Sequence, residues 1–297
     1  MKPLKGKIAI AAGSSRGAGR GIALVLGEAG ATVYVAARTS RHGPKPADNV
    51  PGTVEETAEA VTARGGKGIA VPADLSDEPQ VEALFRRVRK EQGRLDILAH
   101  SAWTADILPA WGKPFWELSP ELWRETLATL STYWLTSVYA ARVMTKQRSG
   151  LIVHVTDNYP DDPSRWRGQV LHDLGHEGVN RLVYGMAAGL RKTKVTVVGM
   201  NPGFMRTERV LRSMKTEKIK RQFRFDLSET PEYIGRAVAA LAADRHSIRK
   251  SGQLLWVADL AREYGFTDVD GSYIPRFDPK APFKPYPPRS APYSAPA

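Results

Sequence analysis

Two histidines four residues apart are the side chains of this sequence best suited to moving a proton. His176 lies at the start of a segment, Gly175–Leu190, whose apolar spacing predicts a helix, and His172 lies three residues before that segment. On a helix, residues four apart share one face. An imidazole titrates close to neutral pH, so each ring can act as an acid or as a base. The chain contains no cysteine, which excludes a thiol nucleophile, a disulfide and a zinc–thiolate site.

A glycine-rich run near the N-terminus has the composition of a phosphate-binding loop. It reads Gly13-Ser14-Ser15-Arg16-Gly17-Ala18-Gly19 and lies between a predicted strand, Lys7–Ala12, and a predicted helix, Arg20–Ala29. Glycine lets the backbone turn tightly and approach a phosphate, while the start of the helix offers free N–H groups and a positive dipole end. The sequence therefore predicts a nucleotide site in which we expect Gly13, Ser15, Arg16, Gly17 and Gly19 to take part.

The end of the second predicted strand indicates which dinucleotide would bind. Thr32–Ala37 is followed by Arg38 and Thr39, whereas an acidic residue there would accept a hydrogen bond from the ribose 2′-hydroxyl of NAD. Arg38 and Arg16 can instead pair with a 2′-phosphate through charge-assisted hydrogen bonds. This pattern favours NADP(H) over NAD(H). The alternative is that both arginines are solvated surface side chains.

The elements that must position these residues alternate between strand and helix. Short apolar runs predict further strands at Gly68–Ala73, Leu95–His100, Leu151–Thr156, Val195–Met200 and Gln253–Val257. Helical spacing predicts further helices at Val54–Arg64, Glu78–Gln92 and Pro231–Ala243, with one or two more in Pro120–Gln147. Strands separated by helices pair in parallel. We therefore expect an α/β fold, a single doubly wound Rossmann-type domain over residues 1–274 with a parallel sheet of about seven strands.

Length and composition agree with one such domain. The chain has 297 residues, of which 42% are hydrophobic and 25% are charged, as is usual for a globular protein. No apolar run approaches the roughly 20 residues of a membrane span. The N-terminal segment lacks the layout of a signal peptide, so we expect a cytoplasmic protein. Residues 275–297 contain eight prolines, which predicts an extended or disordered tail.

The net charge of +12, from 43 basic and 31 acidic residues, points to an anionic ligand. Half of the excess lies in Met205–Phe225, which contains eight Lys or Arg and two Glu. No nucleic-acid recognition module accompanies this charge, so no specific nucleic-acid partner is expected. The segment is either a basic lid that steers an anionic substrate or a solvated amphipathic helix.

With the glycine loop in its strand–helix frame, the chain resembles the short-chain dehydrogenase/reductase family over about residues 5–270. Asn201–Thr207 is similar to the family's Pro-Gly loop, and Asp74 is similar to its aspartate after the third strand. Three further stretches, Gly19–Leu24, Ala29–Tyr34 and Asp259–Gly271, are similar to the family's dehydrogenase/reductase member-one branch. The resemblance implies cofactor contacts at Asp74, Leu75, Ser101, Ala102, Pro202, Gly203, Phe204 and Thr207, in addition to Arg38 and Thr39.

The family's catalytic asparagine, serine, tyrosine and lysine are not found at the matching positions. Thr129 stands near the place of the asparagine, Asp157 at that of the serine, and His172 and His176 at those of the tyrosine and lysine. The resemblance implies that His172 donates or accepts the proton and that Asp157 orients His172 or polarises the substrate. It also implies that His176 contacts the nicotinamide ribose, which makes it both a catalytic and a cofactor residue.

Three functions are compatible with this altered site. The favoured one is an NADP(H)-dependent oxidoreductase that acts on a bulky carbonyl, imine or enone. The second is a non-redox isomerase, lyase or cyclase that keeps the NADP pocket, because relatives of that kind exist in the family. The third is a catalytically inactive nucleotide-binding partner protein. Two histidines and a carboxylate also resemble a metal site, but this spacing is common on helices, so no metal is expected.

Aromatic residues flank the expected substrate pocket. The resemblance places Trp103 beside the nicotinamide, which predicts a bulky or aromatic substrate. Trp116 and Trp123 are expected to pack against the following helix. That helix commonly meets a second subunit in the family, so we expect a homodimer or homotetramer. His100 and His154, on adjacent strand ends, are expected to be hydrogen-bonded structural histidines.

Overall fold

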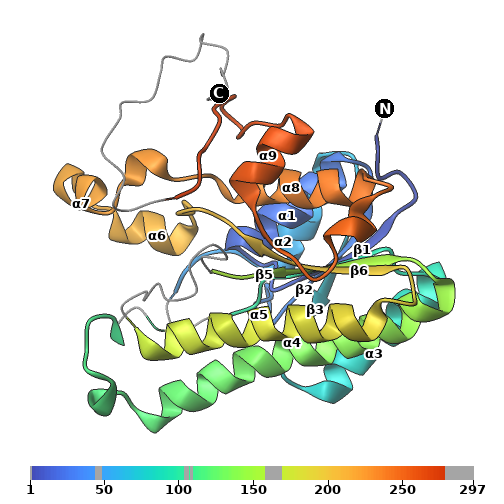
Figure 1. Cartoon of the computed structure of the whole chain (residues 1–297), viewed down its shortest axis with the longest axis horizontal. Coiled ribbons are helices and arrows are strands. Elements are labelled where there is room, and N and C mark those ends of the chain that lie inside the picture. Colours follow the sequence, from blue (N-terminus) through green and yellow to red (C-terminus); the bar gives the residue numbers. More distant parts are fainter. Residues whose placement is uncertain (1, 44–48, 104–106, 108–109, 158–168, 278–297) are drawn as a thin grey trace.

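A computed structural model describes residues 2–43, 49–103, 107, 110–157 and 169–277. Its centre is a parallel sheet of seven strands in the order β3-β2-β1-β4-β5-β6-β7 (Figure 1). The strands are β1 (Ile8–Ala12), β2 (Thr32–Ala37), β3 (Lys67–Pro72), β4 (Ile97–His100), β5 (Gly150–Val155), β6 (Val195–Asn201) and β7 (Leu254–Trp256). This confirms the expected Rossmann-type fold.

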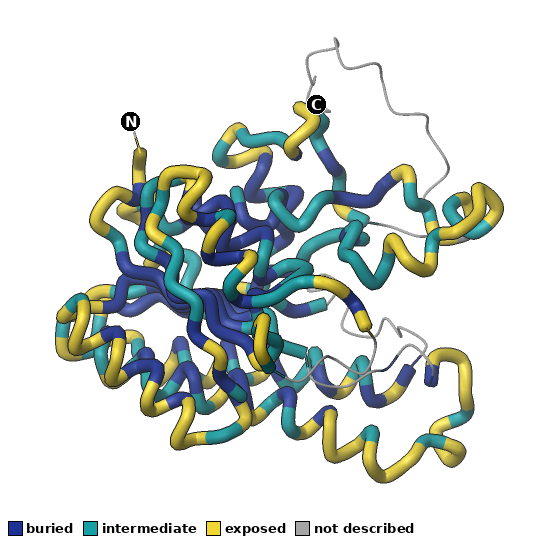
Figure 2. Tube along the Cα trace, turned by 180° about the vertical axis from the view of Figure 1, so that it is seen from behind, coloured by how far each residue is buried: buried dark blue, intermediate teal, exposed yellow. Residues whose placement is uncertain are grey.

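Helices cover both faces of the sheet. One layer contains α1 (Gly17–Glu28), α2 (Val54–Ala63), α8 (Pro231–Ala243) and α9 (Val257–Tyr264), and the other contains α3 (Glu78–Gln92), α4 (Pro120–Gln147) and α5 (Val170–Leu190) (Figure 1). Figure 2 shows the buried strands between helices whose outer faces are exposed. Side chains alternate across a strand. In β1, Ala9 and Ala11 accordingly enter the core under the first layer, and Ile8 and Ile10 enter the core under the second.

The largest difference from the predicted boundaries lies at the start of α5. α5 begins at Val170, five residues before the predicted start, because the side chain of Gln169 accepts hydrogen bonds from the N–H groups of Leu171 and His172. The basic segment forms two short helices, α6 (Glu208–Ser213) and α7 (Glu217–Gln222). The predicted tail lies outside the described residues from 278 onward. Within the described ranges, no helix is long and apolar enough to cross a membrane.

The strand order reverses between β1 and β4, where the connections leave in opposite directions along the sheet. In open α/β sheets, ligands bind outside the carboxyl ends of the strands at this switch point. The loops after β1 and β4 are therefore the expected walls of a binding crevice. They contain the glycine loop and Ser101–Trp103.

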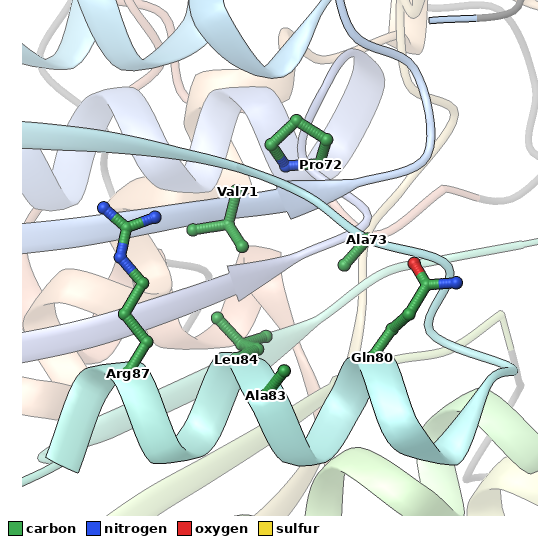
Figure 3. A pocket seen from close by; sticks show the side chains of 7 residues that line it. All are labelled: Val71, Pro72, Ala73, Gln80, Ala83, Leu84 and Arg87. Carbon is green, nitrogen blue, oxygen red and sulfur yellow. The ribbon is translucent and has the colours of Figure 1, made fainter. Parts of the chain in front are cut away.

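A hollow of about 180 Å³ lies elsewhere, between the edge strand β3 and α3 (Figure 3). Its walls include Val71, Leu84 and the side chains of Gln80 and Arg87. Pro72 ends the edge strand and has no N–H to offer a further strand. The hollow contains none of the predicted site residues.

Candidate active site

The glycine loop makes a close backbone contact with the loop that follows β4. Gly13 has a φ of +78°, and a Cβ atom there would lie 2.5 Å from the backbone of Ala102. Any other residue would push apart the loops that follow β1 and β4. Ser101 reinforces the contact because its N–H donates to the carbonyl of Ala12. Gly13, Ser101 and Ala102 therefore meet at the switch point, as predicted.

The start of α1 is built to receive an anion. Arg16 occupies the N-cap position, and its side chain makes no capping hydrogen bond. The N–H of Gly17, the first helical residue, donates instead to the carboxylate of Glu208, at 2.9 Å. A helix N-terminus stabilises negative charge, so this end of α1 fits the phosphates of a dinucleotide.

Arg16 and the end of β2 lie together. The Arg16 guanidinium donates to the hydroxyl of Thr39 at 3.0 Å and to the carbonyl of Gly52 at 3.3 Å. Arg38, the neighbour of Thr39, is exposed. The fold therefore brings the two predicted arginines to the same edge of the crevice.

The other predicted cofactor residues lie at strand ends. The carboxylate of Asp74 accepts hydrogen bonds from the N–H and hydroxyl of Ser76, a local turn that holds Asp74 in place, and Leu75 is buried. After β6, the Pro202-Gly203-Phe204 loop leads to Thr207, which caps α6 by accepting from the N–H of Val210.

Asp157, His172 and His176 form one cluster at the carboxyl end of β5 and the start of α5. His176 Nδ1 accepts a hydrogen bond from the backbone N–H of Asp157, at 3.0 Å. His172 Nε2 lies 3.8 Å from Asp157 Oδ2, which is ion-pair distance when the ring is protonated. The two imidazole centroids are 4.5 Å apart. The cluster predicted from sequence is therefore assembled.

The hydrogen bond to His176 determines which of its nitrogens carries the proton. Since Nδ1 accepts, the neutral ring is protonated on Nε2, which leaves Nε2–H as a donor. The ligand atoms of Asp157, His172 and His176 lie within 4.8 Å of one another. A histidine that binds a metal through Nε2, however, donates from Nδ1. The geometry at His176 therefore favours proton chemistry over metal ligation.

Two tryptophan side chains pack against the histidines of the cluster. The Trp103 ring stacks on His176 with centroids 4.4 Å apart and planes 12° apart, and Trp111 meets His172 edge-on at 5.2 Å. A Cβ on Gly175 would lie 2.8 Å from the Trp103 ring, so glycine on α5 permits this packing. Trp103 directly follows Ala102, which touches Gly13. The loop that follows β4 therefore contacts both the glycine loop, through Ala102, and the histidine cluster, through Trp103.

His100 and His154 are structural. Both are buried and face each other across β4 and β5. His100 exchanges hydrogen bonds with Thr132 and Thr136, and His154 with Ser137, all on α4. Burial lowers the pKa of His154 to about 3 and holds that of His100 well below its usual value. Both rings are neutral at physiological pH.

Other site features were not predicted or were predicted wrongly. Trp116 and Trp123 do not pack into the protein, since their exposed fractions are 73% and 44%. The contact of Glu208 with Gly17 and the buried carboxyl of Glu229 beneath Gly203 were missed. The pair Thr207-Glu208 has the composition of a helix start, but nothing in it indicates contact with a residue 191 positions away.

The fold and the loop at its switch point are those of dinucleotide-binding enzymes. Residues 7–218 match the family model described as short chain dehydrogenase. The chain therefore belongs to the short-chain dehydrogenase/reductase family, whose members use nicotinamide cofactors.

Two mammalian relatives identify the branch within this family. The chain is 37% identical over 282 residues to "Dehydrogenase/reductase SDR family member 1" of Mus musculus, an alignment that covers 91% of this chain and 86% of the relative. It is 35% identical over 280 residues to the Homo sapiens protein of that name, with 91% and 85% covered. These matches confirm the predicted resemblance to the member-one branch.

Solved structures support the fold. A putative dehydrogenase from Xanthomonas campestris superposes with a TM-score of 0.75 at 23% identity, covering 92% of this chain and 94% of the other. A short chain dehydrogenase from Mycobacterium thermoresistibile gives a TM-score of 0.78 at 20% identity, with 97% and 100% covered.

Proposed function

We propose that this protein is an NADP(H)-dependent oxidoreductase in which His172 moves the proton. The supporting observation is the cluster of His172, Asp157 and His176, which lies against the same loop after β4 that the glycine loop contacts. The substrate is a bulky carbonyl, imine or enone compound. The cofactor, when bound, supplies or removes the hydride. The chain itself must bind, orient and handle the proton.

Proton transfer falls on His172 because the Asp157 carboxylate, 3.8 Å from its Nε2, stabilises the protonated ring. Gln169 fixes the backbone of His172 at the start of α5. His176, held by the Asp157 N–H, presents Nε2–H as a donor that would hold the nicotinamide ribose. Trp103 and Trp111 limit the access of water to both rings.

The surroundings of the cluster support an aromatic or anionic substrate. Trp103 and Trp111 offer flat apolar surfaces beside the histidines. α6 and α7 carry an excess of basic side chains, of which Lys220 pairs locally with Glu217. A basic segment next to the crevice would raise the local concentration of an anionic substrate.

A panel of aldehydes, ketones, imines and enones, with NADPH oxidation followed by absorbance, tests the proposal. Turnover of any class supports it. Tight NADPH binding without turnover of any compound contradicts redox chemistry. A substrate that is converted while the nicotinamide absorbance stays constant would assign the crevice to an isomerase, lyase or cyclase instead.

The preference for NADP(H) is expected to depend on Arg38. Arg38→Asp should raise the Kd for NADPH by about 10- to 100-fold, because a charge-assisted hydrogen bond to phosphate contributes about 1.5–3 kcal/mol. The Kd for NADH should fall, since aspartate can accept from the ribose. Titrations of both cofactors measure this. Arg86→Asp, on the exposed face of α3, is the charge-matched control, and an equal effect there would refute a specific role for Arg38.

We also propose that the protein is cytoplasmic and forms a homo-oligomer. α4 and α5 expose large apolar side chains on the outer face of the molecule, including Trp123, Trp134 and Tyr184, which are 44%, 53% and 49% exposed. Exposed apolar groups of this size favour burial against another subunit. Light scattering of the purified chain distinguishes a dimer or tetramer from a monomer.

A further inference from the structure

One of the two acidic side chains in Met205–Phe225 reaches the glycine loop. Glu208 is the first residue of α6, and its Oε2 accepts the N–H of Gly17 at 2.9 Å. Thr207 supports this approach, since its methyl group lies 3.6 Å from where a Cβ on Gly17 would stand. The carboxylate thus occupies the N-terminal end of α1.

The C-terminal end of α6 is also held by a hydrogen bond to another segment. Arg212 donates from Nη2 to the carbonyl of Asn49, at 3.0 Å, in the loop that precedes α2. α6 therefore connects the start of α1 with the loop beside Gly52, to which Arg16 is bonded. The start of α1 is the region that fits the phosphates of the cofactor, and Arg16 is one of the two arginines expected to bind the 2′-phosphate.

Two anions cannot use this position together. The Gly17 N–H has one proton to donate, and the capping site at Arg16 supplies no side-chain acceptor. A phosphate at the start of α1 would also be repelled by a carboxylate held there, because like charges at hydrogen-bonding separations are unfavourable even near the surface. Glu208 has to leave the Gly17 N–H for a phosphate to take that donor.

We propose that Glu208 is a residue of the dinucleotide site, where its carboxylate competes with a cofactor phosphate for the N-terminus of α1 and so couples the position of α6 to cofactor binding. The inference rests on the proposed function, because it takes the ligand to be a dinucleotide. It assigns to Glu208 a part in setting cofactor affinity. The helix that moves carries Arg209 and Arg212, so the basic surface shifts when the cofactor binds.

Titration of the full-length protein with NADPH, followed by tryptophan fluorescence, tests the competition. Glu208→Ala removes the competing charge and should lower the Kd about 3- to 10-fold. Glu208→Gln keeps an acceptor for the Gly17 N–H without the charge and should give an intermediate Kd. Glu208 is a partly exposed side chain on a surface helix, and the glutamine variant preserves its size.

Glu217 provides the matched control. It begins α7 as Glu208 begins α6, pairs with Lys220 at 2.8 Å, and its side chain is 77% exposed. Glu217→Ala makes the same change in net charge within the same segment and should leave the Kd within about twofold of the wild-type value. An equal gain in affinity from Glu217→Ala and Glu208→Ala would overturn the proposal, because it would show a general charge effect.

Hydrogen exchange separates this inference from the proposed function. In the wild-type chain the Gly17 amide should exchange slowly, and Glu208→Ala should speed its exchange without any cofactor present. NADPH should then change the protection of residues 208–213 in the wild-type chain. If NADPH binds tightly, but Glu208→Ala does not change the Kd and NADPH does not change the exchange of α6, the competition is refuted and the proposed cofactor is not. Failure of all variants to bind NADPH overturns the proposed cofactor and this inference together.

Discussion

Replacement of His172 by alanine should reduce kcat by about 10²- to 10⁴-fold, the usual contribution of a positioned acid–base group. The Kd for NADPH should stay within twofold, because the residues proposed to hold the phosphates, Arg16, Gly17 and Arg38, lie on other elements. Steady-state kinetics with the best substrate of the panel and a parallel NADPH titration measure the two quantities. A loss of both activity and binding would assign His172 to the structure of the pocket instead.

Two further variants sharpen this experiment. Asp157→Asn removes the charge that faces His172 Nε2 but keeps the backbone N–H that holds His176. It should lower kcat less than His172→Ala, since the imidazole remains while its partner at ion-pair distance is lost. His246→Ala changes an exposed histidine after α8 and should leave kcat unaltered. Unchanged turnover in His172→Ala would refute the catalytic role.

The sequence was sufficient to predict most of the sheet because the strands between its two edges are almost entirely buried. Runs such as Thr32–Ala37 and Val195–Asn201 are nearly continuous apolar segments, and a parallel strand in the centre of a domain has that composition. The helix Glu78–Gln92 was predicted to the residue, because Asp77 and Gly93 mark its two ends. Local side-chain chemistry determines these features.

Features that depend on contacts between distant segments could not be predicted from the sequence. The start of α5 depends on the capping side chain of Gln169, and α6 and α7 are too short to show helical periodicity. The hydrogen bond from Asp157 to His176 joins residues 19 apart. Family resemblance placed these two residues near each other, but the tautomer of His176 follows only from the geometry.

The exposed tryptophans show a different limit. Trp116 and Trp123 were expected to pack against the following helix, yet both are exposed, and Trp116 contacts Phe115 edge-on at 5.3 Å. Much of a folded protein's surface is apolar. Composition therefore does not distinguish a tryptophan in the core from an exposed tryptophan that contacts another subunit or a ligand.

The largest effect expected on stability comes from Glu229, a carboxyl group buried beneath the Pro-Gly loop. Its Oε2 accepts the N–H of Gly203 at 3.0 Å, and its Oε1 has no hydrogen-bond partner among the described residues. Burial, with a smaller contribution from the nearby Asp268 carboxylate, raises the pKa of Glu229 from 4.5 to about 8, while the Gly203 N–H and Arg206 act in the opposite direction. At neutral pH the folded protein therefore holds a proton that the unfolded chain releases.

Between pH 4.5 and about 8 the folded state binds more protons at Glu229 than the unfolded state does. The contribution of Glu229 to stability therefore falls as the pH rises through this window, by about 1.4 kcal/mol for each pH unit in its middle. Glu229→Gln keeps an oxygen for the Gly203 N–H and does not titrate. Relative to the wild-type protein it should gain about 4 kcal/mol in the free energy of unfolding between pH 5 and pH 9.

Urea denaturation of both proteins at one-unit pH intervals measures this difference directly. Glu82→Gln, on the exposed surface of α3, removes the same charge and should shift the stability by a small and constant amount at every pH. A stability difference between Glu229→Gln and wild type that stays constant from pH 5 to pH 9 would mean that Glu229 ionises as readily in the folded protein as in the unfolded chain. If the free energy of unfolding of Glu229→Gln rises relative to wild type as the pH increases, the carboxyl group of Glu229 is protonated in the folded wild-type protein at neutral pH.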